Sequence, residues 1–262
     1  MNEFSGREYV AVVESRFALH RTELLGSLEE GERKIIALLK GSSYPVSAEA
    51  LLVKAGQDHP YVYRLLQGWA GRARVLPDGR KQFILIFLPG DLFAVKSMFV
   101  AHHPDDIVAI SDIVVERMNH RKLHSAYIGD GDIATRCIWQ VIEEERRLHT
   151  WVVGLGQGSA EERVALLLID FRGRLVLSGD IPPDSLTYTM PLTQAQLADH
   201  LGMTPVHVNR VLKGLRDRHI VSISGGRVGI SDLDALAGAA AALLDPGELH
   251  TSAYVGRRLG AA

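Results

Sequence analysis

The chain has 262 residues, of which 47% are hydrophobic and 23% are charged, and its formal net charge of −2 predicts an ordinary globular protein of two domains. No apolar run reaches the roughly 18 residues of a membrane span, and the acidic start MNEFSGREYVAVVESRF lacks the apolar core of a secretory signal, so we expect a cytoplasmic protein without a membrane partner. A single cysteine, Cys137, excludes a disulfide framework and an all-cysteine iron–sulfur or zinc site within one chain.

The first half of the chain is predicted to form short helices followed by strands. Residues from about 18 to 55 have helix-like patterns. From about 60 to 128, runs of β-branched, aromatic and leucine residues are broken by turn residues. Pro77-Asp78-Gly79 predicts a tight turn, because proline presets φ and glycine adopts a positive φ. The helix-like segment AVKSMFVAHH precedes the strand-like DIVAISDIVVERM. This spacing of strands and turns predicts a compact antiparallel barrel or roll.

The hydrophobic period changes to that of a helix from Asp132 to about Val153. An a/d seam with alternating spacings of four and three residues runs through Ala134, Ile138, Val141, Glu145, Leu148, Val152 and Leu155. Such a seam favours a partner helix, so we interpret it as a homodimer interface. A core helix with a wide apolar face is the alternative. Cys137, one position before Ile138, is either a redox switch or a small apolar residue.

The glycine-rich stretch GLGQGS, from Gly154 to Ser159, is expected to end this helix and to mark a domain boundary. Ser159 and Glu162 have the spacing of a capping box for the next helix. An alternative hypothesis makes this stretch the phosphate-binding loop of a nucleotide-dependent enzyme. It is disfavoured because Ser159 stands where the third glycine is required and Asp170 lies too early for a ribose ligand. No catalytic constellation stands out, so we expect no enzyme.

The segment LTQAQLADHLGMTPVHVNRVLKGL predicts two short helices joined at Gly202. Thr193 and Gln196 form a capping box, and Thr204 is an N-cap followed by Pro205 at the first helical position. One face of the second helix is apolar and is formed by Val208, Val211, Leu212 and Leu215. The remaining surface presents Val206, His207, Asn209, Arg210, Lys213 and Asp217. This pattern predicts a helix-turn-helix.

The sequence after these helices predicts a β-hairpin. IVSIS and VGIS flank a Gly225-Gly226 turn, and Arg227 lies at its tip, as in the wing of a winged helix-turn-helix. From Thr193 to Ile230 there are five basic and two acidic residues, a local net charge of +3 within a mildly acidic chain. This concentration of positive charge indicates a nucleic-acid partner.

The segment LTQAQLADHLGMTPVHVNRVLKGLRDRHIV with GGRVGI resembles the DNA-binding domain of the Crp/Fnr superfamily of transcription regulators. WAGRARVLPDGRKQFILIFLPGDLF resembles the effector roll of that family, and the seam helix resembles its dimer helix. The resemblance implies that Arg210 reads a guanine, since its fork matches O6 and N7. It also implies that Val206 and His207, flanked by Asn209, face base edges, and that Lys213 and Arg227 contact phosphates. Thr193 and Thr204 would hold phosphates at helix N-termini.

The sequence departs from the family in two places. Pro205 and Val206 stand where well-known members have charged residues, so the operator should differ from that of the cyclic-AMP receptor. Cyclic-nucleotide binders hold the phosphate with an arginine, and the corresponding region here has His103-Pro104 or the acidic pair Asp105-Asp106. Because carboxylates repel phosphate, cyclic AMP is disfavoured. The cysteines of the oxygen-sensing members are missing.

The region around His102 also contains residue types that bind metals, including His103, Asp105 and Asp106. Adjacent histidines on a surface loop are ordinarily solvated, so we expect no metal site. The sequence identifies no cofactor or effector.

The predicted fold is α+β, with an N-terminal antiparallel β-roll of cyclic-nucleotide-binding type, a long dimerisation helix and a C-terminal winged helix-turn-helix. The expected domains are residues 1–131, 132–156 and 157–245, with a tail at 246–262. The predicted function is sequence-specific regulation of transcription by a homodimer on a pseudo-palindromic site in double-stranded DNA. RNA polymerase is the further partner if the protein is an activator.

Overall fold

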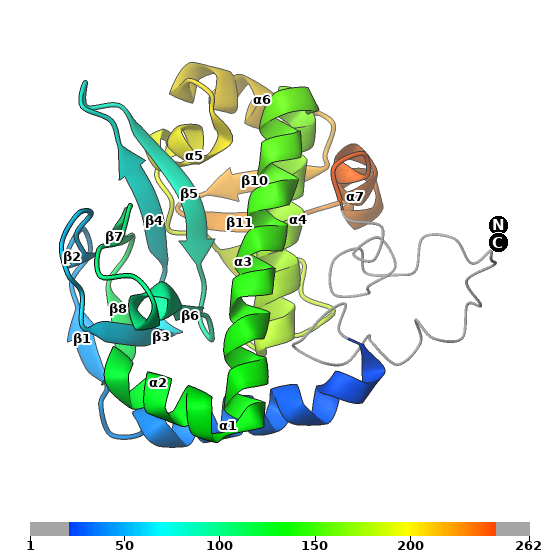
Figure 1. The fold of residues 1–262 in the computed structure, drawn as a ribbon. Helices are drawn as coiled ribbons and strands as arrows, with labels where there is room; N and C mark the ends of the chain where they lie inside the picture. Colours follow the sequence, from blue (N-terminus) through cyan, green and yellow to red (C-terminus); the bar gives the residue numbers. More distant parts are fainter. Residues whose placement is uncertain (1–20, 245–262) are drawn as a thin grey trace, which may run out of the picture. The chain divides into compact units, whose positions relative to one another are not determined.

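The computed structural model describes residues 21–244 and contains two compact units (Figure 1). One unit holds Gly26–His149 together with Pro191–Gly202. The other holds Thr150–Met190 and the chain from Met203 onward. The tail predicted for residues 246–262 lies outside the described residues, and the predicted domain boundaries remain a prediction.

The first unit is built on a roll of two four-stranded antiparallel sheets. Its strands are β1 (Tyr44–Val46), β2 (Leu51–Val53), β3 (Tyr61–Gln67), β4 (Ala70–Val75), β5 (Lys81–Phe87), β6 (Leu92–Phe93), β7 (Asp106–Ala109) and β8 (Ile113–Asn119). The strand orders are β1-β8-β3-β6 and β2-β7-β4-β5. Every pairing is antiparallel, which confirms the predicted roll.

The prediction of helices over residues 18–55 is wrong for its second half. Strands β1 and β2 lie there, and they pair with β8 and β7. Both strands have only three residues, which is too short to show a period of two. Their conformation is therefore set by partners about 60 residues further along the chain rather than by local propensity.

The core of the roll lies between its two sheets. Aromatic side chains fill its centre, where Phe93 stacks on Tyr63 and on Phe87 with ring centroids 5.0 Å apart in each pair. Aliphatic side chains of both sheets surround them. These are Val53, Leu65, Leu85, Ile107, Ile113 and Val115. The Pro77-Asp78-Gly79 turn joins β4 to β5, with Gly79 at φ 87°, as the sequence predicts.

The roll unit also holds the 3-10 turn η3 (Val95–Met98) and helix α5 (Gln194–Leu201), whereas the 3-10 turn η2 (Thr22–Leu24) belongs to the other unit. Three further helices complete the roll unit. They are α1 (Leu25–Leu39), α2 (His120–Gly129) and the first part of α3 (Gly131–Gln157). Figure 1 shows α1 and α2 along one end of the roll. A second buried cluster joins the three helices and includes Ile35, Leu39, Leu123, Ile133 and Cys137.

Helix α3 continues through Gly154 and Gly156 and ends at Gln157, within the glycine-rich stretch that was predicted to end it. Each glycine costs a helix about 1 kcal/mol, which the continued backbone hydrogen bonding and packing offset. The Gly158 N–H still donates to the Gly154 carbonyl at 2.9 Å. Residues 151–153 are helical, so the strand that the nucleotide-loop hypothesis requires before the glycines is replaced by a helix.

The second unit contains helices around a small sheet. Its elements are α4 (Ala160–Ser178), β9 (Thr187–Thr189), α6 (Pro205–Asp217), β10 (Val221–Ser224), β11 (Arg227–Ile230) and α7 (Leu233–Ala240). The antiparallel sheet has the order β10-β11-β9. Helix α4 begins at the predicted Ser159–Glu162 capping box and packs against α6 and α7. The Tyr188 hydroxyl donates to the Leu168 carbonyl at 2.9 Å and ties β9 to α4.

Candidate DNA interface

Helix α5 (Gln194–Leu201) has the start and end that the sequence predicts. The Thr193 hydroxyl accepts the Gln196 N–H at 3.2 Å, and the Gln196 side chain accepts the Thr193 N–H at 2.8 Å. These two bonds satisfy two of the free N–H groups at the helix start. Gly202 ends the helix in the left-handed region at φ 62°, which an L side chain rarely adopts, so a sharp turn follows.

Helix α6 (Pro205–Asp217) begins at the predicted cap. Thr204 is extended, and its hydroxyl accepts the His207 N–H at 3.2 Å. Pro205 is the first helical residue, where its missing N–H costs nothing. Val208 and Leu215 are buried, and Val211 and Leu212 are half-buried, so the predicted apolar face is present. Packing of this face against α4 leaves the opposite face free for recognition.

Six of the seven predicted DNA-contacting residues on or beside α5 and α6 are exposed around the two helix starts: Thr193, Thr204, Val206, His207, Asn209 and Arg210. Lys213, one turn after Arg210, is also exposed. Val206 has 69% of its surface accessible. Within the described part of the chain, Arg210 and Lys213 form no ion pair, so their charges are available to a ligand.

The wing positions a further arginine. Strands β10 and β11 form the predicted hairpin, and both Gly225 and Gly226 have positive φ. Arg227 is exposed, and its Nη2 donates to the Thr187 hydroxyl of β9 at 3.1 Å. Sequence reasoning missed Thr187, because the two residues are 40 positions apart and only the register of the sheet brings them together.

Arg218, which follows the last residue of α6, forms an ion pair within its own unit. Arg218 Nη2 lies 2.7 Å from Glu161 Oε1 of α4. Its charge is therefore already balanced by a carboxylate, unlike those of Arg210 and Lys213. The pair is exposed, so its contribution to stability is small.

The loop before β7 differs from the sequence interpretation. His103 is buried at 4% exposure, so the expectation of a solvated histidine pair is wrong for it, whereas His102 is exposed. His103 Nε2 lies 2.7 Å from the Ser97 hydroxyl. Burial, followed by the neighbouring Lys96 and Arg72 charges, lowers the pKa of His103, so the ring is neutral at physiological pH. In residues 21–244 no three metal-ligating side chains come together.

The two acids of this loop have separate roles. Asp105 is buried, accepts a hydrogen bond from Arg74 Nε at 2.6 Å and lies 3.6 Å from Arg72 Nε. Asp106 accepts the Ala55 N–H at 2.7 Å. The carboxylate of Asp105 thus already binds the arginines nearest to it, and a phosphate group has no free arginine there.

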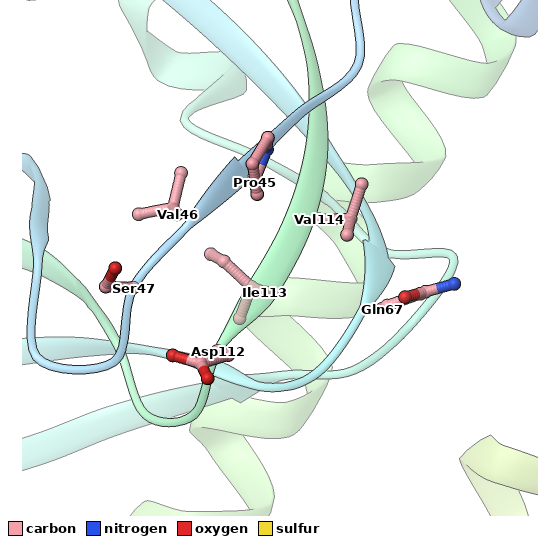
Figure 2. Close-up of a pocket in the computed structure, with 7 residues that line it drawn as sticks. All are labelled: Pro45, Val46, Ser47, Gln67, Asp112, Ile113 and Val114. Carbon is pink, nitrogen blue, oxygen red and sulfur yellow. The ribbon is translucent and has the colours of Figure 1, made fainter.

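A surface pocket of about 370 Å³ lies elsewhere on the roll, where β1, β3 and β8 meet (Figure 2). It is lined by Pro45, Val46, Ser47, Gln67, Asp112, Ile113 and Val114. Figure 2 shows the Gln67 side chain extending away from Ser47. These seven residues include no cation, and the carboxylate of Asp112 accepts the Ala48 N–H at 2.9 Å. The pocket therefore offers nothing that would hold a nucleotide phosphate.

Helix α3 presents an apolar strip to solvent. Ile138, Val141, Ile142, Val152 and Leu155 are exposed, and the charged Glu145 lies among them. Ala134 is half-buried. Leu148, another member of the predicted seam, packs against the core of the roll instead. The side of α3 that faces the roll carries buried polar groups, including Arg136, Gln140 and Glu144.

Two sequence profiles match the chain. The cyclic nucleotide-binding domain matches residues 43–128, and the Crp-like helix-turn-helix domain matches residues 162–239. The first range covers the roll and the second covers α5, α6 and the wing. No helix within residues 21–244 is long and apolar enough to cross a membrane.

Curated relatives match over most of their length. The transcriptional activator protein FnrL of Cereibacter sphaeroides is 24% identical over 195 residues, 73% of this chain and 78% of that protein. The nitrogen fixation regulation protein FixK of Bradyrhizobium diazoefficiens is 28% identical over 180 residues, 68% of this chain and 74% of that protein. The solved structure of FixK2 from Bradyrhizobium japonicum has a TM-score of 0.67 and 26% identity, covering 75% of this chain and 95% of that one.

A cyclic nucleotide-binding roll followed by a Crp-like helix-turn-helix defines the class: the protein is a transcription regulator with a DNA-binding domain. The chain thus contains two known domains, the cyclic nucleotide-binding domain and the Crp-like helix-turn-helix domain, and over two thirds or more of its length it is similar to FnrL and FixK. The same matches give no support to the nucleotide-dependent enzyme.

Proposed function

We propose that the protein is a cytoplasmic homodimer that binds a pseudo-palindromic operator through two copies of α6. The observation that carries this proposal is the first turn of α6, which is capped by Thr204 and exposes Val206, His207 and Arg210 while Val208 and Leu215 anchor the helix. A recognition helix reads base edges with its N-terminal residues, and two copies occupy sites one helical turn (about 34 Å) apart.

Each exposed residue has a role that fits its chemistry. Arg210 reads a guanine through its two-pronged guanidinium. Val206 offers only apolar contact, as to a thymine methyl, and His207 and Asn209 supply hydrogen bonds beside it. Lys213 and Arg227 neutralise phosphates, and the helix starts at Thr193 and Thr204 bind phosphate oxygens. Arg210 and His207 thus carry most of the base discrimination.

The dimer follows from the apolar strip of α3. Besides the side chains that α3 packs on its own roll, the helix leaves a strip of apolar side chains in water, and a partner would bury that strip. A second α3 would do so with the same residues from both chains. If the protein is an activator, RNA polymerase is the partner recruited at the promoter.

The test begins with selection of bound fragments from a random DNA pool. We expect a two-fold symmetric consensus whose half-sites are one helical turn apart. Arg210→Ala should relax the base preference at one position of each half-site. It should also cost about 1–3 kcal/mol of binding free energy. Arg218→Ala is the matched control, since Arg218 is paired with Glu161. An unchanged consensus for Arg210→Ala would reject the assigned reading, and a thermal shift with NAD or ATP but no DNA binding would favour an enzyme.

A further inference from the structure

The interior of the roll contains an ion-pair network that the DNA interface does not use. Arg72 of β4 is 6% exposed, and its Nη1 donates to Glu144 Oε2 of α3 at 2.9 Å. Glu144 is buried to the same degree. On its other side, Arg72 lies 3.6 Å from Asp105, which also binds Arg74. Charged groups therefore connect β4, the loop before β7 and helix α3.

Such a network is poorly explained as a source of stability. Burying two charges costs desolvation energy, and their mutual attraction only offsets that cost. Well-packed apolar side chains of similar volume would make the folded protein as stable or more stable. Arg72 Nε is also buried and has no hydrogen-bond partner in the part of the chain that the structure describes. What the ion pair adds is direction, because the hydrogen bond from Arg72 Nη1 to Glu144 Oε2 forms only in one relative position of the two side chains. The Arg72–Glu144 pair therefore fixes where α3 lies on the roll.

The network also neutralises the positive charges that an anionic ligand would need for binding. Arg72 and Arg74 are neutralised by Glu144 and Asp105. Beside them, burial lowers the pKa of Lys96, and the Arg72 charge lowers it further. Burial, followed by the nearby Lys96 and Arg72 charges, also lowers the pKa of His103, so its ring is neutral. A phosphate entering this region would have to displace a carboxylate of the chain itself.

Glu144 lies on a helix that extends from the roll unit into the other unit. Helix α3 is continuous from Gly131 to Gln157. Its residues up to His149 belong to the roll unit, and those from Thr150 belong to the unit that carries α6 and the wing. A helix is stiff along its axis, so a restraint applied at Glu144 acts on the whole of α3, including its exposed apolar strip.

We propose that Glu144 is an internal effector, whose carboxylate takes the place against Arg72 that an anionic ligand would take and so holds α3 in its DNA-binding state. The protein then binds its operator without any small molecule. This inference rests on the proposed function and adds the means of its regulation. A DNA-binding conformation that is stabilised by the chain's own contacts follows the same thermodynamics as one that is stabilised by a ligand.

The experiment uses the full-length protein, unfolded and refolded to remove small molecules, and an operator obtained by selection. Its affinity is measured for the wild type, Glu144→Gln and Glu32→Gln. Glu32→Gln is the matched control because it breaks another buried ion pair of α3, the 2.6 Å contact between Glu32 and Arg136. Circular-dichroism melts show the folded fraction of each variant. Should Glu144→Gln fail to fold, the double variant Arg72→Met with Glu144→Met replaces it, since this leaves no unpaired charge between the two positions.

We expect the refolded wild type to bind its operator, and Glu144→Gln to bind it at least about tenfold more weakly per folded molecule. Glu32→Gln removes a different restraint on α3 and leaves the Arg72–Glu144 pair in place, so it should weaken binding much less. Equal affinities for the two variants would show that the pair is only structural and overturn the inference. Tighter operator binding by the wild type on adding cyclic AMP or inorganic phosphate would overturn it as well. If the wild type selects no DNA at all, the proposed function fails before any variant is compared.

Discussion

The Thr204 hydroxyl accepts the backbone N–H of His207 at 3.2 Å, so the cap of α6 and one of its proposed base-reading residues belong to the same first turn. The cap fixes the direction in which the helix leaves the turn at Gly202. It thereby also fixes where Val206 and His207 are displayed, so stability and recognition depend on the same hydroxyl.

Thr204→Ala should lower the free energy of unfolding of the C-terminal unit by about 1 kcal/mol, because one N–H at the helix start loses its acceptor. Thr204→Ser keeps the hydroxyl and should retain most of the stability. Urea unfolding and amide exchange at His207 measure both effects. Equal stability of the Ala and Ser variants would show that the cap contributes nothing.

Lys213→Ala and Arg227→Ala should weaken binding to all DNA sequences alike. Each loses one phosphate contact, so the slope of log K against log salt should become less steep by about 1 for each half-site. Fluorescence anisotropy over a salt series provides the measurement. A change in the selected consensus would mean that these side chains read bases instead.

Ile138→Glu should convert the dimer into a monomer. The side chain is 49% exposed in one chain, so the substitution leaves the fold of the protomer intact and places a charge in the proposed interface. Light scattering reports the mass. Leu148→Ala is the control, because Leu148 packs on the roll. It should cost up to about 2–3 kcal/mol of stability without dissociating the dimer.

Cys137 should resist alkylation in the native protein. It is 2% exposed, and burial raises the pKa of its thiol to about 11, so little thiolate exists at pH 8. Labelling with iodoacetamide should reach one equivalent only in denaturant. Rapid labelling of the folded protein would instead restore the redox-switch hypothesis for this residue.

The stability of the roll should fall as the pH drops below about 6.5. Burial, followed by the charge of His103, lowers the pKa of His59 to about 4, so below its ordinary value of 6.5 the unfolded chain takes up a proton that the folded chain does not. Denaturant melts between pH 7 and pH 4 should show this loss, with His59 contributing at most about 1.4 kcal/mol per pH unit. His59→Phe preserves an aromatic ring beside Tyr63 and should flatten the profile. A profile parallel to that of the wild type would contradict this assignment.

The features that depend on neighbours a few positions away were predictable from residue type and spacing. The capping boxes at Thr193 and Ser159, the Thr204–Pro205 helix start and the Gly225-Gly226 turn all form between residues at most three or four apart, so residue type and spacing were sufficient. The order of roll, long helix and winged helix-turn-helix was predictable for the same reason, since periodicity is a local property.

Contacts between residues far apart in the chain were not predictable in this way, because they depend on how the strands and helices pack. Arg72 and Glu144 are 72 residues apart, and neither has a local pattern that marks it as half of a buried ion pair. The burial of His103, the packing of Leu148 on the roll and the pairing of the short strands β1 and β2 depend likewise on the closure of the sheets. A buried charge is tolerated only where the fold supplies its partner, and the partner is set by topology rather than by sequence spacing.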